Sequence, residues 1–402
     1  MVRDIDVRDH GRRHVIPITR PSLGDEEVAA AAEVIRSGWL TQGARVEQFE
    51  AAVAGYVGAK HAVAVSNCTS ALHLALVAAG VGPGDEVICP SFSFIATANA
   101  IVHAGARPVF VDIEPRTYNM DPDLVEAAIT SKTKAIMPVD QIGLAADIPA
   151  IREISRRRNL KVVEDAAPSL GSAIGGRRVG SLSDLTCFSF HPRKSITTGE
   201  GGVITTDDDD SDALLRRLRS HAASTSDLHR HRSGTLQFEE YHELGYNYRM
   251  TDIQAAIGVV QMRKLDAALA ARRHLATRYA ALLGGHDWIE VPYEPADRVH
   301  TFQSYCVRLQ PPASREAIMA ELAGRGIATR RGVMAIHLEP YYRRLDPDLR
   351  LPVTERCTAE TILLPLFVGL TEAEQDFVAE ALLEAGDGSA LHASHLRTAR
   401  TP

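Results

Sequence analysis

Between about residues 60 and 205, short runs rich in Val and Ile alternate with segments of helical pattern. These runs show little alternation of apolar and polar residues, as expected for strands buried on both faces of a sheet. The sequence therefore predicts an α/β fold, with a mostly parallel central sheet flanked by helices. We expect its strands at His61–Val65, Glu86–Cys89, Arg107–Val111, Ala135–Val139, Lys161–Glu164, Leu185–Phe190 and Gly202–Thr205.

Helix signals lie between and beyond these strands. Asp121–Pro122 places a capping acid before a first-turn proline, and Gly38 follows an apolar helical pattern. A long helical stretch is expected over Thr251–Leu283, with an interruption near Gly258.

A change in composition after the long helix indicates a second domain. The chain becomes Pro-rich and mixed from Val291. We predict a large domain at 16–285 and a smaller C-terminal α+β domain at 286–385. A tail at 1–15 precedes them, and a flexible polar tail follows at 386–402.

Composition restricts the partners. The chain has 44 basic and 51 acidic residues and no basic stripe, which argues against nucleic acid. No apolar run approaches the roughly 18 residues of a membrane span, and the N-terminus lacks the apolar centre of a secretory signal. The five cysteines are scattered without a C-x-x-C pair, which is typical of a reducing compartment. We expect a soluble protein of the cytoplasm.

One strand ends in small polar residues where a helix begins, at Ser66–Leu74. The hydroxyls of Thr69 and Ser70 and the free backbone N–H groups of a helix start favour an anion, although ordinary capping by either hydroxyl is the alternative. Two other phosphate motifs are excluded: Lys194–Ser195 follows Arg193 instead of the glycine of a Walker loop, and Gly80–Gly84 follows a helix.

Two charged side chains also follow strands: Asp165 and, later, Lys194. Alone, they would be interpreted as a helix cap and a solvated lysine. Together with the anion-binding turn they supply an amine for a Schiff base, a carboxylate for a pyridine nitrogen and an anchor for a phosphate. The combination predicts pyridoxal 5'-phosphate (PLP) as cofactor.

The order of these motifs resembles the DegT/StrS family of sugar aminotransferases, which are fold-type I PLP enzymes related to aspartate aminotransferase. The resemblance covers roughly residues 16–383. It rests on Gly38–Thr41, Ser66–Leu76, Gly82–Val87, Pro90–Phe92, Glu164–Ala167, Ser189–Gly202 and Gly245–Asp252.

The resemblance implies roles for single residues. Lys194 is the Schiff-base lysine and Asp165 lies at the pyridine nitrogen. The other implied cofactor contacts are Thr69, Ser70 and Ser189 around the phosphate, Phe94 stacked on the ring, and Asn247 reaching the phosphate of a neighbouring subunit. The last implies a homodimer with shared active sites. A core role for Phe94 and a local cap by Asn247 are the alternatives.

Two histidines are weaker candidates for substrate binding. His191 lies three residues before Lys194, and a ring satisfied by backbone is its alternative role. His337 resembles a position near the family's substrate pocket. The His229–Arg232 cluster lacks the spacing of metal ligands, so no metal is predicted.

The chain departs from the family pattern at two positions. Pro168 stands where many relatives have Gln or His, and Asp140 stands where His is common. Both changes affect the expected pocket, and hence the substrate.

The resemblance implies transfer of an amino group from glutamate or glutamine to a keto sugar. Because Arg193–Gly202 resembles the perosamine-forming enzymes, a nucleotide-linked 4-keto-6-deoxyhexose is the first candidate acceptor. A keto-cyclitol or another ketone of antibiotic biosynthesis is an alternative. The family's sugar dehydratase branch is a rival within PLP chemistry, but it has a His at the position of Lys194, so Lys194 argues against it. A PLP-binding regulator without turnover is a further alternative, but no DNA-binding face is visible.

Overall fold

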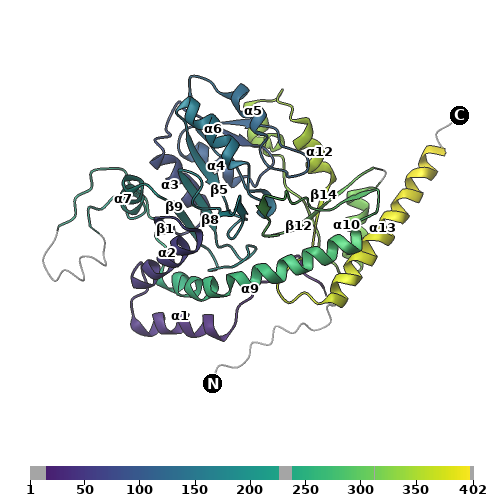
Figure 1. Ribbon diagram of the computed structural model, residues 1–402, viewed down its shortest axis with the longest axis horizontal. Helices are drawn as coiled ribbons and strands as arrows, with labels where there is room; N and C mark the ends of the chain where they lie inside the picture. The colour runs from purple at the N-terminus through teal and green to yellow at the C-terminus, as the bar shows by residue number, and fades with distance from the viewer. Residues whose placement is uncertain (1–14, 226–237, 312, 399–402) are drawn as a thin grey trace.

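The computed structural model describes residues 15–225, 238–311 and 313–398 (Figure 1). A seven-stranded sheet with the order β1-β9-β8-β5-β4-β2-β3 forms its centre. The strands are β1 His61–Val65, β2 Glu86–Pro90, β3 Arg107–Val111, β4 Thr133–Ile136, β5 Lys161–Asp165, β8 Leu185–Ser189 and β9 Gly202–Thr206. Only β9 runs antiparallel to its neighbours, so the predicted mostly parallel sheet is confirmed.

The boundary predicted for the fourth strand was wrong. β4 ends at Ile136, and of the three further residues expected in it only Val139 forms a bridge, to Asp165. Pro138 explains the early end, because proline has no N–H to give to a sheet ladder.

Helices cover both faces of the sheet. One apolar core packs α3 Cys68–Ala78, α4 Ala96–His103 and α7 Asp209–Leu218 against one face. Two further cores pack α2 Ala44–Val57 and α9 Asp252–Leu283, and then α5 Pro122–Ala128 and α6 Ile148–Arg158, against the other. Because each strand is covered on both faces, its residues read as a continuous apolar run.

A second sheet, β10-β12-β14-β13, is antiparallel. Its elements and the helices and turns around it are β10 Ile289–Glu290, β12 Tyr305–Leu309, α10 Arg315–Gly324, β13 Arg330–Arg331, η2 Ile336–Leu338, α11 Pro340–Leu345, α12 Pro352–Glu360, β14 Thr361–Leu364 and α13 Glu372–Thr398. It shares an apolar core with α10, α13 and the second half of α9. Figure 1 shows α9 running from below the central sheet to this second sheet.

The remaining elements are small or peripheral. A three-stranded sheet joins β6 Ala173–Ile174, β7 Arg177–Arg178 and β11 Arg298–Val299, and η1 Gln141–Gly143 follows β4. Helix α1, Asp25–Ser37, packs on α9 and ends at Gly38, which takes the left-handed conformation expected of a glycine cap.

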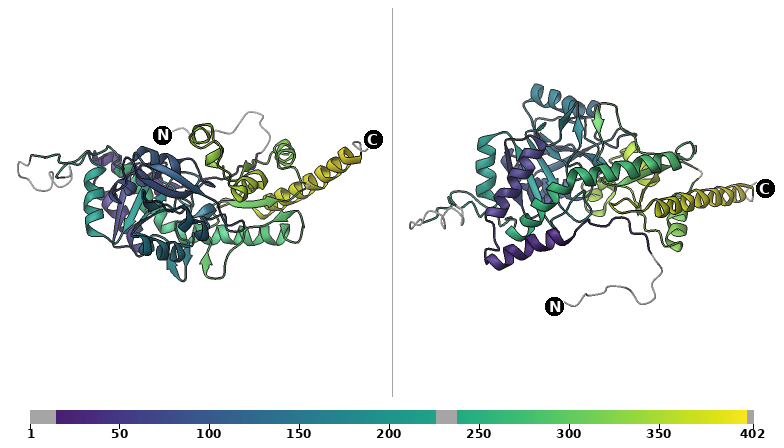
Figure 2. Two further views of the ribbon diagram at one scale, coloured as in Figure 1. Left: turned by 90° about the horizontal axis from the view of Figure 1, so that it is seen from above. Right: turned by 60° about the horizontal axis from the view of Figure 1, so that its bottom comes forward.

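The C-terminal region differs from the expected polar tail. Helix α13 continues beyond Gly386 to Thr398 and extends away from the rest of the chain (Figure 2). The Ala- and Leu-containing sequence between Ser389 and Leu396 is compatible with helix, whose local hydrogen bonds need no partner element. None of the described helices is long and apolar enough to cross a membrane.

The expected interruption of α9 at Gly258 was also wrong, because the helix is continuous from Asp252 to Leu283. Gly258 serves packing instead. A Cβ atom there would lie 2.6 Å from Cε2 of Phe49 on α2, a buried ring. The glycine therefore lets α2 and α9 approach each other.

We predict that Gly258→Ala destabilises the protein by about 1 to 3 kcal/mol, because the added methyl group overlaps the Phe49 ring. Gly55→Ala is the matched control, since Gly55 is an exposed residue of α2 with nothing within 4 Å of the added atom. It should be neutral or stabilising by up to about 1 kcal/mol. Urea unfolding midpoints of the two variants measure the difference, and equal midpoints would contradict the packing role.

Candidate functional site

Strand direction brings the predicted site residues to one edge of the central sheet. β1, β2, β5 and β8 all point the same way, so their carboxyl ends lie together. The segments that leave them are Ser66–Thr69, Ser91–Phe94, Ala166–Ser169 and Phe190–Lys194. This edge is where open parallel sheets bind ligands.

The anion-binding turn lies at the start of α3. Asn67 caps this helix, and its side chain accepts a hydrogen bond of 2.9 Å from the Ser70 amide. The amides of Cys68 and Thr69, in the first turn of the helix, have no carbonyl partner within the helix. Gly202 permits the close packing here, because a Cβ atom would lie 2.5 Å from the Asn67 carbonyl oxygen.

Asp165 ends β5 with its side chain buried, at 4% exposure. Oδ2 accepts a hydrogen bond of 2.7 Å from Thr97 Oγ1, and Oδ1 accepts one of 3.2 Å from the Ala167 amide. Burial raises the pKa of Asp165, while the Thr97 hydrogen bond and the charge of Lys194 oppose this rise. No described side chain forms an ion pair with the carboxylate.

Lys194 lies in the loop between β8 and β9, and its amide donates to the His191 carbonyl at 2.9 Å. The loop folds back on itself, because the Thr198 amide donates to the Phe190 carbonyl. The Thr197 amide donates to the side chain of Gln261 on α9, which ties the loop to that helix. Burial lowers the pKa of Lys194, while the nearby Cys68 and Asp165 act to raise it. The amine is thus held near Asp165 in a desolvated environment.

Two other predicted cofactor contacts border this region. Ser189 is the buried last residue of β8, next to the loop that carries Lys194. Phe94 follows β2 and is 69% exposed, so it is not a core residue of this chain. An exposed aromatic ring at the sheet edge can cover a flat ligand.

Asn247 lies on a segment fixed between two elements. Its neighbours bond to the end of α7 and to the residue after β1: the Tyr246 amide donates to the Leu218 carbonyl, and the Tyr248 carbonyl accepts from the Ser66 amide. The rings of Tyr246 and Tyr248 stack at 5.2 Å, and Asn247 is exposed. Its backbone is therefore rigidly placed while its side chain faces outward.

The two histidines differ in their environments. Nδ1 of His191 accepts a hydrogen bond of 3.2 Å from the Arg193 amide, so the backbone satisfies one ring nitrogen. His337 is fully buried, with Nδ1 2.7 Å from Ser91 Oγ and Nε2 3.2 Å from Glu355 Oε1. Because a carboxylate only accepts, Nε2 donates to Glu355, while Nδ1 forms its hydrogen bond with the Ser91 hydroxyl. Both nitrogens of His337 are thus engaged within the protein.

Sequence reasoning missed the residues that surround Asp165. Thr97 comes from α4, and its hydroxyl also lies 2.7 Å from Ser93 Oγ. Asp140 and Glu164 are buried acids near Asp165, and burial raises the pKa of both, that of Glu164 to about 7. The one available signal was Asp140 itself, a departure from the family pattern.

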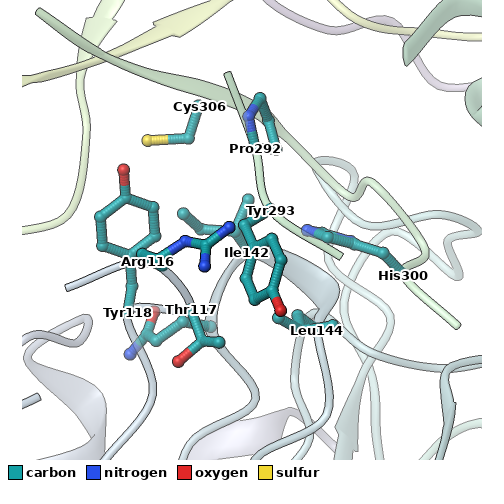
Figure 3. A pocket seen from close by; sticks show the side chains of 10 residues that line it. Arg116, Thr117, Tyr118, Ile142, Leu144, Pro292, Tyr293, His300 and Cys306 are labelled. Atoms are coloured by element: carbon teal, nitrogen blue, oxygen red, sulfur yellow. The ribbon is translucent and has the colours of Figure 1, made fainter. Parts of the chain in front are cut away.

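A small cavity of about 10 Å³ lies between the loops of the central sheet and the second sheet (Figure 3). The guanidinium of Arg116 lies 3.6 Å from the centre of the Tyr293 ring at its wall. This volume is about that needed for one water molecule, so the cavity is a small packing gap and is too small for a substrate.

A metal site finds no support in the part of the chain that the structure describes, which contains no group of three His, Cys, Asp or Glu side chains placed to hold an ion. The His229–Arg232 cluster lies outside the described residues.

The donors present fit PLP. A buried carboxylate without a cationic partner suits a pyridinium, a desolvated amine nearby suits an aldehyde, and the first turn of α3 suits a phosphate. When bound, PLP supplies an electron sink and carries the amino group between two half-reactions.

Comparisons with known proteins agree with this chemistry. The sequence profile of the DegT/DnrJ/EryC1/StrS aminotransferase family matches residues 21–383. GDP-perosamine synthase of Caulobacter vibrioides is 42% identical over 91% of this chain and 97% of that protein.

Two solved structures are similar over nearly the whole chain. The aminotransferase TlmJ from Streptoalloteichus hindustanus has a TM-score of 0.86 at 34% identity, covering 93% of this chain and 99% of TlmJ. Spr1654 from Streptococcus pneumoniae, solved in its PMP form, has a TM-score of 0.88 at 30% identity, covering 93% of this chain and 100% of that one.

We predict that Thr97→Val weakens PLP binding about tenfold, because the ionised Asp165 loses a charge-assisted hydrogen bond. The same loss raises the pKa of Asp165 further, so the defect should grow as the pH falls. Thr97→Ser keeps the hydroxyl and is the control. Absorbance titrations of PLP at several pH values test this, and equal affinities for Val and Ser would contradict it.

Proposed function

Because the chain belongs to the DegT/DnrJ/EryC1/StrS aminotransferase family, we propose that this PLP-dependent enzyme transfers an amino group from glutamate or glutamine to a nucleotide-linked keto sugar. The observation that carries this proposal is the desolvated Lys194 amine beside the buried, unpaired Asp165 carboxylate. The sequence relationship to GDP-perosamine synthase supports a 4-keto-6-deoxyhexose as acceptor. A keto-cyclitol is the second candidate.

Each residue of the proposed site has a separate task. Asp165 keeps the pyridine nitrogen protonated, since an adjacent negative charge favours the charged ring. Lys194 holds the cofactor and, once released, its Nζ takes a proton from the donor and returns one to the acceptor. Burial lowers the pKa of Lys194 and so increases the share of neutral amine that can act as a base.

Positive charge beside Lys194 suits an anionic substrate. Arg193 is half-buried, and burial followed by the charge of Arg330 lowers its pKa. Arg330 lies on β13 at the edge of the second sheet. Among the described residues, no carboxylate pairs with either guanidinium, in contrast to Arg308, which pairs with Glu290. The donor carboxylate and the diphosphate of a nucleotide-linked acceptor both match this charge.

We also propose a homodimer with shared active sites. Exposed apolar side chains lie near Asn247 in the sequence, with Phe238 and Leu244 each 82% exposed and Tyr241 60% exposed. Covering such residues with a second copy would stabilise the assembly. The outward-facing Asn247 amide would then reach the partner's phosphate site. All five cysteines are free and at least partly buried, which supports our placement in the cytoplasm.

The first test follows the visible absorbance of the purified protein with PLP. The lysine-bound cofactor should absorb near the visible range, lose this band on addition of glutamate, and regain it with a nucleotide-linked keto sugar. Lys194→Ala should lack the band. A wild-type protein without a lysine-dependent band would overturn the proposed function, and failure of every sugar nucleotide would favour the keto-cyclitol.

A mixing experiment tests the shared site. Lys194→Ala and Asn247→Asp should each be nearly inactive, because one lacks the amine and the other repels the phosphate. Hybrid dimers combine both defects in one site and leave the other intact, so an equal mixture should regain about a quarter of the wild-type activity. No recovery after verified subunit exchange would show that each site is complete within one chain.

A further inference from the structure

We propose that Asp140 is a positioning residue that acts as a neutral carboxylic acid, donating through Ser169 to the Ala166 carbonyl and so fixing the turn that presents Asp165. The proposal deepens the function proposed above and rests on it for the role of Asp165.

Asp140 contacts the Asp165 turn through both main chain and side chain. Its amide donates to the Asp165 carbonyl at 3.1 Å. Its side chain is 0% exposed, with Oδ1 accepting from the Ala146 amide at 2.8 Å and Oδ2 lying 2.6 Å from Ser169 Oγ. The carboxyl group therefore links the loop after β4 to the turn after β5.

The hydroxyl of Ser169 indicates where the proton lies. Ser169 Oγ is 2.6 Å from Asp140 Oδ2 and 3.2 Å from the Ala166 carbonyl oxygen. A serine has one proton to donate, so two pure acceptors would compete for it. A protonated Asp140 removes the competition, because it donates to Ser169, which donates its own proton to Ala166.

The surrounding charges favour the same state. Asp140, Glu164 and Asp165 are three acids that are 4% exposed or less. Burial, then the charge of Glu164, raises the pKa of Asp140 well above its usual value, and Asp165 adds to this rise. A buried site cannot hold three neighbouring negative charges without compensation.

The cations near these acids are directed elsewhere. Arg152 lies near Glu164, but it forms an ion pair of 2.9 Å with Asp184. The charge of Lys194 lowers the pKa of Asp165. Glu164 accepts instead from two hydroxyls, those of Ser183 and Thr186, at 2.7 and 3.0 Å. No described cation compensates Asp140, so its proton leaves Asp165 as the anion available to the cofactor.

Ionisation of Asp140 would have two effects on Asp165. Ser169 would turn its hydroxyl proton to the new carboxylate, and the Ala166 carbonyl would keep only the hydrogen bond of 3.0 Å from the Ser169 amide, so the turn would lose one of its two contacts. The added negative charge would also raise the pKa of Asp165. Both effects oppose a fixed, ionised Asp165.

Asp140→Asn is the decisive variant, because the amide can donate to Ser169 and accept from Ala146 without carrying a charge. We expect PLP affinity and the glutamate half-reaction within about threefold of wild type, and less loss of activity at alkaline pH. Asp140→Ala and Ser169→Ala each remove a hydrogen bond of the Asp140–Ser169–Ala166 series, and each should lower PLP affinity and the rate of the glutamate half-reaction about tenfold. Melting temperatures check that all three variants fold. If Asp140→Ala does not fold, Ser169→Ala still tests the hydrogen bonds between Asp140, Ser169 and Ala166.

The protein without PLP gives independent measurements. Glu164, whose pKa is raised to about 7, also contributes a neutral carboxylic acid band near neutral pH, so the comparison is made in the Glu164→Gln background. The infrared spectrum of Glu164→Gln at neutral pH should keep a neutral carboxylic acid band, and this band should disappear when Asp140→Asn is added. A folded-state pKa raised above the unfolded value stabilises the fold at low pH, and this stability is lost as the pH rises. The melting temperature of the wild type should therefore fall relative to Asp140→Asn as the pH rises above 3.8, the ordinary pKa of an aspartic acid.

The outcomes separate the two proposals. If Asp140→Asn is as defective as Asp140→Ala, or if the infrared band is absent from Glu164→Gln, then Asp140 acts as an anion and the inference is wrong. If the wild type shows no lysine-dependent band with PLP, the proposed function fails. The infrared and melting results on the protein without PLP still decide the state of Asp140 in that case.

Discussion

A buried carboxylate without a cation is the constraint around which this site is built. Asp165 ends a central strand, and among the described residues its carboxylate has direct hydrogen bonds only from Thr97 and the Ala167 amide. Burial works against its charge, and the pyridinium of PLP would supply the missing positive partner. Cofactor binding and the ionisation of Asp165 therefore favour each other.

Segments next to the second sheet contribute to the site through polar contacts with the loops of the central sheet. Gln303 donates to the Arg193 carbonyl at 2.5 Å, next to Lys194, and Thr301 donates to the Pro168 carbonyl at 3.1 Å. His337 joins Ser91 at the end of β2. These contacts hold the strand-end loops from outside the central sheet. A substitution in these segments can thus displace a loop that leaves the central sheet.

Several groups other than the proposed lysine and aspartate border the site. Pro168 offers only its carbonyl, which Thr301 already occupies, so it cannot replace the side-chain contact expected in many relatives. Arg193 and Arg330 place unpaired positive charge next to the proposed lysine. In the proposed site, the groups that face an anionic substrate are thus different from the residues proposed for the chemical step.

The sequence by itself determined the α/β class and most of the strand positions, and it predicted PLP as cofactor with Lys194 and Asp165 as its proposed site. Buried parallel strands are continuous apolar runs, and the residues that follow them are local in sequence, so both can be recognised without the fold. Tertiary structure decided what depends on contacts between distant segments. Gly258 did not break its helix because it packs against Phe49, and Thr97 and Asp140 reach Asp165 only when strands and helices far apart in the chain come together.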